Sequence, residues 1–184
     1  MSLYLITGGA RSGKSRYAET LAQTLGGDDV LYIATLETGD EEMERRAARH
    51  RQQRPTTWHT LEVPLEVAAA VENGSEVVVL LDCLSGFVTN LLLKFEDLGE
   101  EGALEAIIKA VDTLVDTLKN TDKQIVIVTN EVGAGVVPAY PLGRWYRDAL
   151  GLANQRVAQT ADSVCVMTVG LPHILKGKFP EVSV

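Results

Sequence analysis

The sequence predicts an α/β fold with a doubly wound, mainly parallel sheet and helices on both faces. Short apolar runs rich in β-branched residues recur along the chain, and segments with helical spacing separate them. The runs are continuous rather than alternating, which indicates strands covered on both faces, as in a parallel sheet. Alternation of strand and helix adds the right-handed crossovers typical of such sheets.

The elements follow from the apolar pattern in chain order. Strands are expected where apolar runs lie between turns, over residues 3–7, 30–34, 77–81, 124–129 and 163–169, with a weaker one over 57–63. Helices are expected where apolar residues recur every three or four positions, over 14–25, 65–72, 85–95, 102–119 and 142–161, and, with almost no apolar stripe, over 40–53. Clusters of Gly, Asn and Asp at 26–29, 73–74 and 120–122 predict turns.

Length and composition exclude several classes of protein. The chain has 184 residues, the size of one domain, so a single catalytic domain over residues 1–184 is expected. Its 17 Lys and Arg against 25 Asp and Glu give a net charge of −8, which argues against general nucleic-acid binding. No run approaches the roughly 20 apolar residues of a membrane span. Residues 1–7 lack the basic start of a signal peptide, and Cys83 and Cys165 are too few for a disulfide framework, so a cytoplasmic location is expected.

A phosphate-binding loop follows the first predicted strand. It matches the pattern of Gly, four residues, Gly, Lys and Ser or Thr, in the residues Gly8, Gly9, Ala10, Arg11, Ser12, Gly13, Lys14 and Ser15. The glycines let backbone N–H groups approach phosphates, Lys14 supplies positive charge, and the Ser15 hydroxyl suits Mg²⁺. The alternative is a glycine turn without a ligand, but a strand before it and a helix after it favour a P-loop NTPase-like fold.

A second metal ligand is expected at Asp82. This aspartate ends the apolar run over 77–81, where P-loop proteins place a second carboxylate for Mg²⁺. The alternative is a turn aspartate or a helix N-cap. With Ser15, Asp82 predicts a nucleoside triphosphate and Mg²⁺ but does not identify the acceptor.

The segment 40–54 concentrates five of the 17 basic residues between Arg45 and Arg54. In a helix, Arg46, His50 and Arg54 share one face, because they are four residues apart. Arginines beside an imidazole bind phosphate and favour its neutral, nucleophilic form, so His50 is a candidate for covalent nucleotidyl transfer. Taken alone, the segment is better explained as a solvated surface helix with an incidental histidine.

Several separated blocks together resemble one enzyme family. They are the phosphate loop, 32–35, 49–51 with 54–55, 82–84 with 90–92, 129–133 with Gly135, Val137 and Pro138, and Arg144 with 147–148, Gly151 and 154–155. The chain resembles the bifunctional adenosylcobinamide kinase and adenosylcobinamide-phosphate guanylyltransferase family of cobalamin biosynthesis over residues 3 to about 170.

The resemblance implies a two-step enzyme. A nucleoside triphosphate, ATP or GTP, phosphorylates the aminopropanol hydroxyl of adenosylcobinamide, and GTP then transfers GMP to adenosylcobinamide phosphate through a guanylylated histidine. That histidine corresponds to His50. The resemblance therefore favours a catalytic role for His50 over a solvated surface helix with an incidental histidine. The resemblance also implies a homotrimer and nucleotide contacts at Ala34, Thr35, Arg51, Gln52, Gln53, Arg54 and Glu62, in addition to the phosphate loop and Asp82.

Other readings remain open. Glu131 is either a metal ligand or general base, or a carboxylate that orders its loop. Arg144 and Arg147 bind phosphate or corrinoid, or belong to a helix ion pair with Asp148. A single-activity P-loop small-molecule kinase and a nucleotide-dependent switch protein are the rival functions, and neither requires a covalent intermediate.

Overall fold

A computed structural model describes residues 2–36 and 54–182 of the chain. The predicted helix over 40–53, with His50, Arg51, Gln52 and Gln53, lies outside the described residues.

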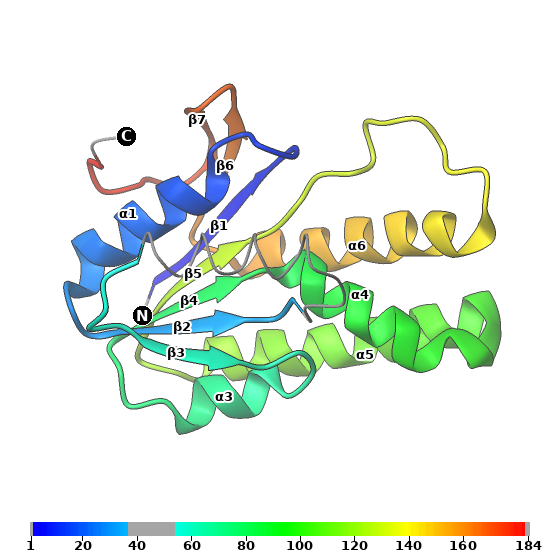
Figure 1. Cartoon of the computed structure of the whole chain (residues 1–184), viewed down its shortest axis with the longest axis horizontal. Helices are drawn as coiled ribbons and strands as arrows, with labels where there is room; N and C mark the ends of the chain where they lie inside the picture. Colours follow the sequence, from blue (N-terminus) through cyan, green and yellow to red (C-terminus); the bar gives the residue numbers. More distant parts are fainter. Residues whose placement is uncertain (1, 37–53, 183–184) are drawn as a thin grey trace.

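The described strands form one sheet in the order β3-β2-β4-β5-β1-β6-β7 (Figure 1). Its strands are β1 (Ser2–Gly8), β2 (Val30–Ala34), β3 (His59–Glu62), β4 (Val78–Asp82), β5 (Gln124–Val128), β6 (Ser163–Thr168) and β7 (Leu171–Lys176). The first six strands are parallel, and β7 runs antiparallel to β6. All six predicted strands are present, and the mainly parallel sheet is confirmed.

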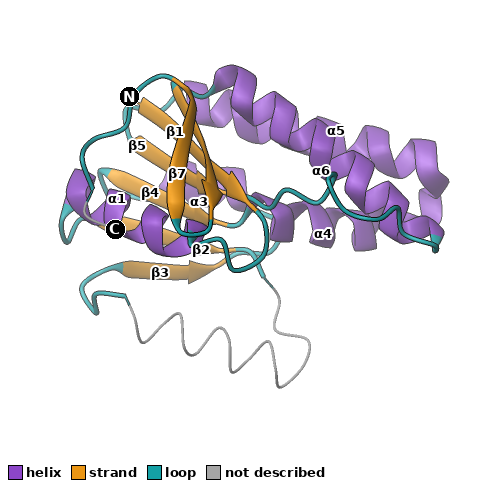
Figure 2. Cartoon of the chain, turned by 90° about the horizontal axis from the view of Figure 1, so that it is seen from above, coloured by secondary structure: helices purple, strands orange, loops and turns teal. Residues whose placement is uncertain are grey.

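Helices cover both faces of the sheet, as predicted. They are α1 (Lys14–Gly26), α3 (Val67–Asn73), α4 (Leu84–Phe95), α5 (Gly99–Lys119) and α6 (Pro141–Thr160), with a short 3₁₀ helix at Glu96–Leu98. On one face, α1 buries Tyr17 and Leu21 against β1, β4 and β5. The other face carries α3 to α6, and Figure 2 shows α4, α5 and α6 extending beyond the end of the sheet.

The helices form where their apolar residues make a single stripe. In α5, buried side chains recur at Ala103, Ile107, Val111, Leu114 and Leu118. This spacing of three or four residues places them on one helical face, which packs on the sheet and on α6. Strands β4 and β5 are buried along almost their whole length, as the continuous apolar runs predicted.

Strand β7 was not expected as a separate element. Its side chains are mostly exposed and it includes Pro172, so its pattern alone does not predict a strand. Pairing with β6 produces it, after a turn in which Val169 and Gly170 both have positive φ. Tertiary pairing therefore overrides weak local propensity here.

The C-terminal residues after β7, which resemble no block of the family, pack on the α1 face. The ring of Phe179 lies 5.4 Å from the ring of Tyr4 and 6.1 Å from that of Tyr17. Val182 joins the same apolar cluster. The C-terminal end of the described chain thus lies beside α1 (Figure 2).

Within residues 2–36 and 54–182, no helix combines the length and the apolar character that crossing a membrane requires.

Candidate active site

The predicted phosphate and metal residues meet at the carboxyl edge of the sheet. Ala34 at the end of β2 lies opposite Asp82 at the end of β4, and Asp82 lies opposite Val128 of β5. The phosphate loop leaves β1 at the same edge, because β1 pairs with β5 in parallel. Ligands in doubly wound sheets bind at this edge, so the arrangement is that of a nucleotide site.

The phosphate loop has a conformation that its glycines make possible. Gly8 and Gly13 have φ values of 155° and 94°. A Cβ on Gly8 would lie 2.6 Å from Ser12 Oγ and 2.7 Å from the carbonyl oxygen of Met167, so no larger residue fits there without a shift. The helix α1 begins at Lys14, the lysine of the motif. Backbone N–H groups at such a helix start bind phosphate well.

Two neighbouring segments fix the walls of the loop. The Glu131 N–H donates to the Gly8 carbonyl at 3.2 Å, and the Gly170 N–H donates to the Ser12 carbonyl at 3.0 Å. The Lys14 Nζ donates to the Gly9 carbonyl at 3.1 Å and folds over the loop. The loop is therefore held by the residues after β5 on one side and by the β6–β7 turn on the other.

Asp82 is oriented by Tyr32, which begins the block 32–35 of the family resemblance but has no role in the predicted site. The Tyr32 hydroxyl donates to Asp82 Oδ2 at 2.6 Å. Burial, and then the Asp82 charge, raise the pKa of Tyr32 far above its usual value, so the hydroxyl stays protonated and remains a donor. The N-cap of α4 is Cys83, whose Sγ accepts from the Gly86 N–H. Asp82 therefore does not serve as that cap.

Thr35 holds the backbone that follows Asp82. Its hydroxyl donates to the Cys83 carbonyl at 2.6 Å and accepts from the Cys83 N–H at 3.0 Å. Its own N–H donates to the Asp82 carbonyl at 3.2 Å. Asn90 Nδ2 donates to the Thr35 carbonyl at 2.7 Å. These bonds occupy the Thr35 side chain within the protein, while its predicted nucleotide contact stays a prediction.

Arg54 lies against Tyr32 and Glu19. Its guanidinium carbon is 3.5 Å from the centre of the Tyr32 ring, and its Nε is 3.9 Å from Glu19 Oε1. Both side chains are largely buried, with 8% of Arg54 and 15% of Glu19 exposed. Glu62, the last residue of β3, lies opposite Ala34 at the same sheet edge.

Glu19 was also missed by the sequence analysis, although its spacing was a usable signal. It lies four residues after Ser15 in α1, one helical turn along the same face. Burial raises the pKa of the Glu19 carboxyl to about 7; the Asp82 charge acts in the same direction, and Arg54 opposes it. The Glu19 carboxyl therefore keeps its proton up to near neutral pH in the folded state.

Glu19 makes stability depend on pH, and Glu19→Gln should remove this component. The folded state holds a proton on Glu19 between pH 4.5 and about 7 that the unfolded chain releases, so the free energy of unfolding falls as pH rises through this window. The shift corresponds to on the order of 3 kcal/mol. Denaturant unfolding at pH 4 and pH 8 measures this effect. The free energy of unfolding of the variant, relative to that of the wild type, should be higher at pH 8 than at pH 4. An equal difference at both pH values would contradict this assignment.

The loop after β5 is ordered by its own polar residues. Asn154 accepts from the Thr129 hydroxyl at 2.7 Å and donates to the Asn130 carbonyl at 3.0 Å. The Glu131 carboxylate accepts from the Gly133 N–H. Arg144 donates to the carbonyls of Pro138 and Ala139. These contacts favour the structural reading of Glu131 and Arg144, since each side chain orders the loop.

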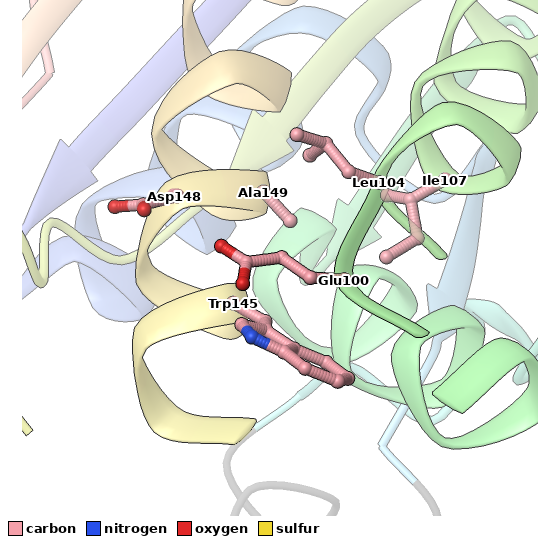
Figure 3. Close-up of a pocket in the computed structure, with 6 residues that line it drawn as sticks. All are labelled: Glu100, Leu104, Ile107, Trp145, Asp148 and Ala149. Carbon is pink, nitrogen blue, oxygen red and sulfur yellow. The ribbon is translucent and has the colours of Figure 1, made fainter. Parts of the chain in front are cut away.

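A small hollow between α5 and α6 lies outside this constellation. Its lining comes from these two helices and contains none of the predicted site residues (Figure 3): Glu100, Leu104, Ile107, Trp145, Asp148 and Ala149.

Comparison with known proteins identifies the family. The family described as cobinamide kinase / cobinamide phosphate guanyltransferase matches residues 4–175. The chain belongs to this family. Among its relatives, the bifunctional adenosylcobalamin biosynthesis protein CobP of Pseudomonas aeruginosa is 44% identical over 95% of this chain and 97% of its own length. The proteins named CobU from Escherichia coli and Salmonella typhimurium are 40% and 39% identical, each over 92% of this chain and 97% of its own length.

Family membership confirms the resemblance and the enzyme class. The chain is a bifunctional enzyme with cobinamide kinase and cobinamide phosphate guanylyltransferase activity. Among solved structures, an ATPase domain aligns with a TM-score of 0.55 and 13% identity, covering 99% of this chain and 79% of that one. This likeness concerns the fold alone and confirms the P-loop NTPase-like class. The roles of the individual site residues remain predictions.

Proposed function

We propose that the family's two reactions use the phosphate loop and Asp82 for the triphosphate and its metal, and His50 as the covalent nucleophile for GMP. The observation that carries the proposal is the position of the described residues on either side of the His50 segment. Thr35 donates its N–H to the Asp82 carbonyl, and Arg54 lies on Tyr32, which donates to the Asp82 carboxylate. Thr35 and Arg54, on either side of the His50 segment in the sequence, are therefore both linked to Asp82, one directly and one through Tyr32.

The donor set fits Mg²⁺. The Ser15 hydroxyl and the Asp82 carboxylate supply the hard oxygen ligands that Mg²⁺ prefers, and phosphates and water complete such sites. When bound, Mg²⁺ would neutralise charge on the phosphates. Tyr32 keeps one oxygen of Asp82 in a fixed direction.

In the kinase step, the acceptor hydroxyl of adenosylcobinamide attacks the γ-phosphorus of ATP or GTP, the nucleoside diphosphate leaves, and the hydroxyl proton passes to solvent. Lys14 and the loop N–H groups stabilise the charge that develops on the phosphate oxygens. In the second reaction, a ring nitrogen of His50 attacks the α-phosphorus of GTP, and the bond to pyrophosphate breaks. A phosphate oxygen of adenosylcobinamide phosphate then attacks the histidine-bound GMP, which frees the imidazole and yields adenosyl-GDP-cobinamide.

Metal removal tests the shared use of this site. Purified enzyme given adenosylcobinamide, ATP, GTP and Mg²⁺ should form the phosphate and then the GDP derivative, as followed by mass spectrometry. Excess EDTA should stop both steps, and added Mg²⁺ should restore both. Asp82→Asn should require more Mg²⁺ for each step. Full activity in EDTA for either step would remove Ser15 and Asp82 from a metal role in that step.

The proposal includes a homotrimer in the cytoplasm, as the resemblance implies. The homotrimer is supported by exposed apolar residues on the loop before α6 and on β7, which a second chain could cover, namely Val136, Val137, Tyr140, Leu171 and Leu175.

A single-activity kinase would show no labelled protein intermediate, and a switch protein would hydrolyse nucleotide without any corrinoid.

A further inference from the structure

We propose that Glu19, Tyr32 and Arg54 are positioning residues for guanylyl transfer. Their contacts fix Arg54, the first described residue after the segment that contains His50, relative to Asp82. The inference rests on the proposed role of His50. In this inference Arg54 acts through its contacts with Tyr32 and Glu19 rather than through a direct contact with nucleotide.

The three residues come from separate elements and meet on the α1 face of the sheet. Glu19 belongs to α1, Tyr32 to β2, and Arg54 precedes β3. The Arg54 guanidinium stacks on the Tyr32 ring at 3.5 Å and approaches Glu19 at 3.9 Å. A planar guanidinium held both by a ring face and by a carboxylate has little freedom to turn, which a lysine ammonium would keep.

Stability alone does not explain this arrangement. Buried ion pairs often contribute no more stability than apolar side chains of the same size, because desolvation offsets their attraction. Glu19 also faces the like charge of Asp82. Among the described residues, Glu19 Oε1 is buried without a hydrogen-bond partner, which is unfavourable for stability. The charged pair adds a defined position for Arg54, which an apolar contact would specify less strictly.

Tyr32 connects this anchor to the metal carboxylate. One edge of its side chain donates to Asp82 Oδ2 at 2.6 Å, while its ring face carries Arg54. Through these two contacts of Tyr32, a displacement of Arg54 would move Asp82, and a displacement of Asp82 would move Arg54. His50 is four residues before Arg54 in the sequence, and four residues of fully extended chain span about 14 Å at most. The anchor therefore limits how far His50 can reach from the phosphate site.

The test separates positioning from nucleotide binding. Arg54→Lys keeps the charge and loses the stacked plane, and Glu19→Gln keeps the shape and loses the ion pair. At pH 8, where Glu19 is ionised because its pKa is about 7, each variant should lower the single-turnover rate of guanylylation by α-labelled GTP by about tenfold or more, as misplacement of a reacting group does. The dissociation constant for GTP should change far less. The double variant should be no slower than the slower single variant, because both act through one contact.

A control ion pair on the surface is that of Arg156 with Asp112, whose atoms lie 3.7 Å apart on α6 and α5 and whose side chains are about half exposed. Arg156→Lys should leave guanylylation unchanged. Thermal melting of every variant separates misplacement from unfolding, and if Arg54→Lys does not fold, the nearly isosteric Glu19→Gln decides the question. Tyr32→Phe, which keeps the ring, should guanylylate faster than Tyr32→Leu.

The inference is overturned if Arg54→Lys weakens GTP binding without slowing the saturated reaction, since Arg54 would then contact nucleotide directly. It is also overturned if folded Glu19→Gln guanylylates at the wild-type rate. His50→Ala in the same assay reports separately on the proposed function. Full labelling of that variant rejects the histidine mechanism, whereas its failure to label together with normal Glu19→Gln rejects only the positioning network.

Discussion

His50→Ala should abolish covalent labelling of the enzyme by GTP labelled at the α-phosphate. The alanine has no nitrogen to attack the α-phosphorus, so no GMP can be held on the protein. In the wild type the label should survive denaturation and be lost in acid, as a phosphorus–nitrogen bond is. Formation of adenosyl-GDP-cobinamide should disappear with the label, while phosphorylation of adenosylcobinamide should persist. Denaturing gels and scintillation counting measure the first result, and mass spectrometry measures the second.

The chain supplies two matched controls, because it contains three histidines. His59 is paired with Glu76 at 2.8 Å, and His173 lies in β7 opposite Val166. His59→Ala and His173→Ala should both label like the wild type. A fully labelled His50→Ala would move the nucleophile elsewhere, and loss of label in His173→Ala with retention in His50→Ala would identify that residue instead.

Lys14→Ala should nearly eliminate the kinase step. Lys14 begins α1, and its ammonium bends back to the Gly9 carbonyl across the loop. A phosphate entering the loop would meet this charge, whose effect grows as negative charge develops in the transition state. Loss of one such group costs about 10²–10³-fold in kcat. Steady-state phosphorylation of adenosylcobinamide at saturating nucleotide is the measurement.

Lys119→Ala provides the control for a general loss of positive charge. Lys119 ends α5, where it is half exposed and 3.4 Å from Asp116. Its removal should leave phosphorylation intact. Unchanged phosphorylation by Lys14→Ala would exclude Lys14 from the chemistry. A higher KM with unchanged kcat would assign it to ground-state binding alone.

Much of the fold could be predicted because its signals are local. The continuous apolar runs of β4 and β5 report burial on both faces, and the spacing in α5 reports one packed side. Strand β7 could not be predicted in this way. Its exposed, proline-containing sequence becomes a strand only because β6 offers a free edge. The packing of Phe179 on Tyr4 likewise depends on where β7 ends, because Phe179 follows this strand in the sequence.

The candidate site divides in the same manner. Its phosphate loop is a contiguous motif, and Asp82 ends a recognisable strand, so both could be named from the sequence. Glu19 belongs to no contiguous motif, and Tyr32 lies in the block 32–35, which does not indicate what its side chain contacts. Their roles arise from contacts across 50 residues to Asp82 and across 35 residues to Arg54, and no spacing along the chain encodes these contacts.

By itself, the sequence determined the class of chemistry: a P-loop, a carboxylate after a parallel strand, and the blocks that indicate the family. These are properties of residue type and local order, which the chain carries in any conformation. The tertiary structure decided which side chains orient that chemistry. Only folding brings α1, β2 and the segment that precedes β3 together, and only burial between them turns Glu19, Tyr32 and Arg54 into one contact beside Asp82. The physical reason is that contact and desolvation depend on distance in space, not on distance along the chain.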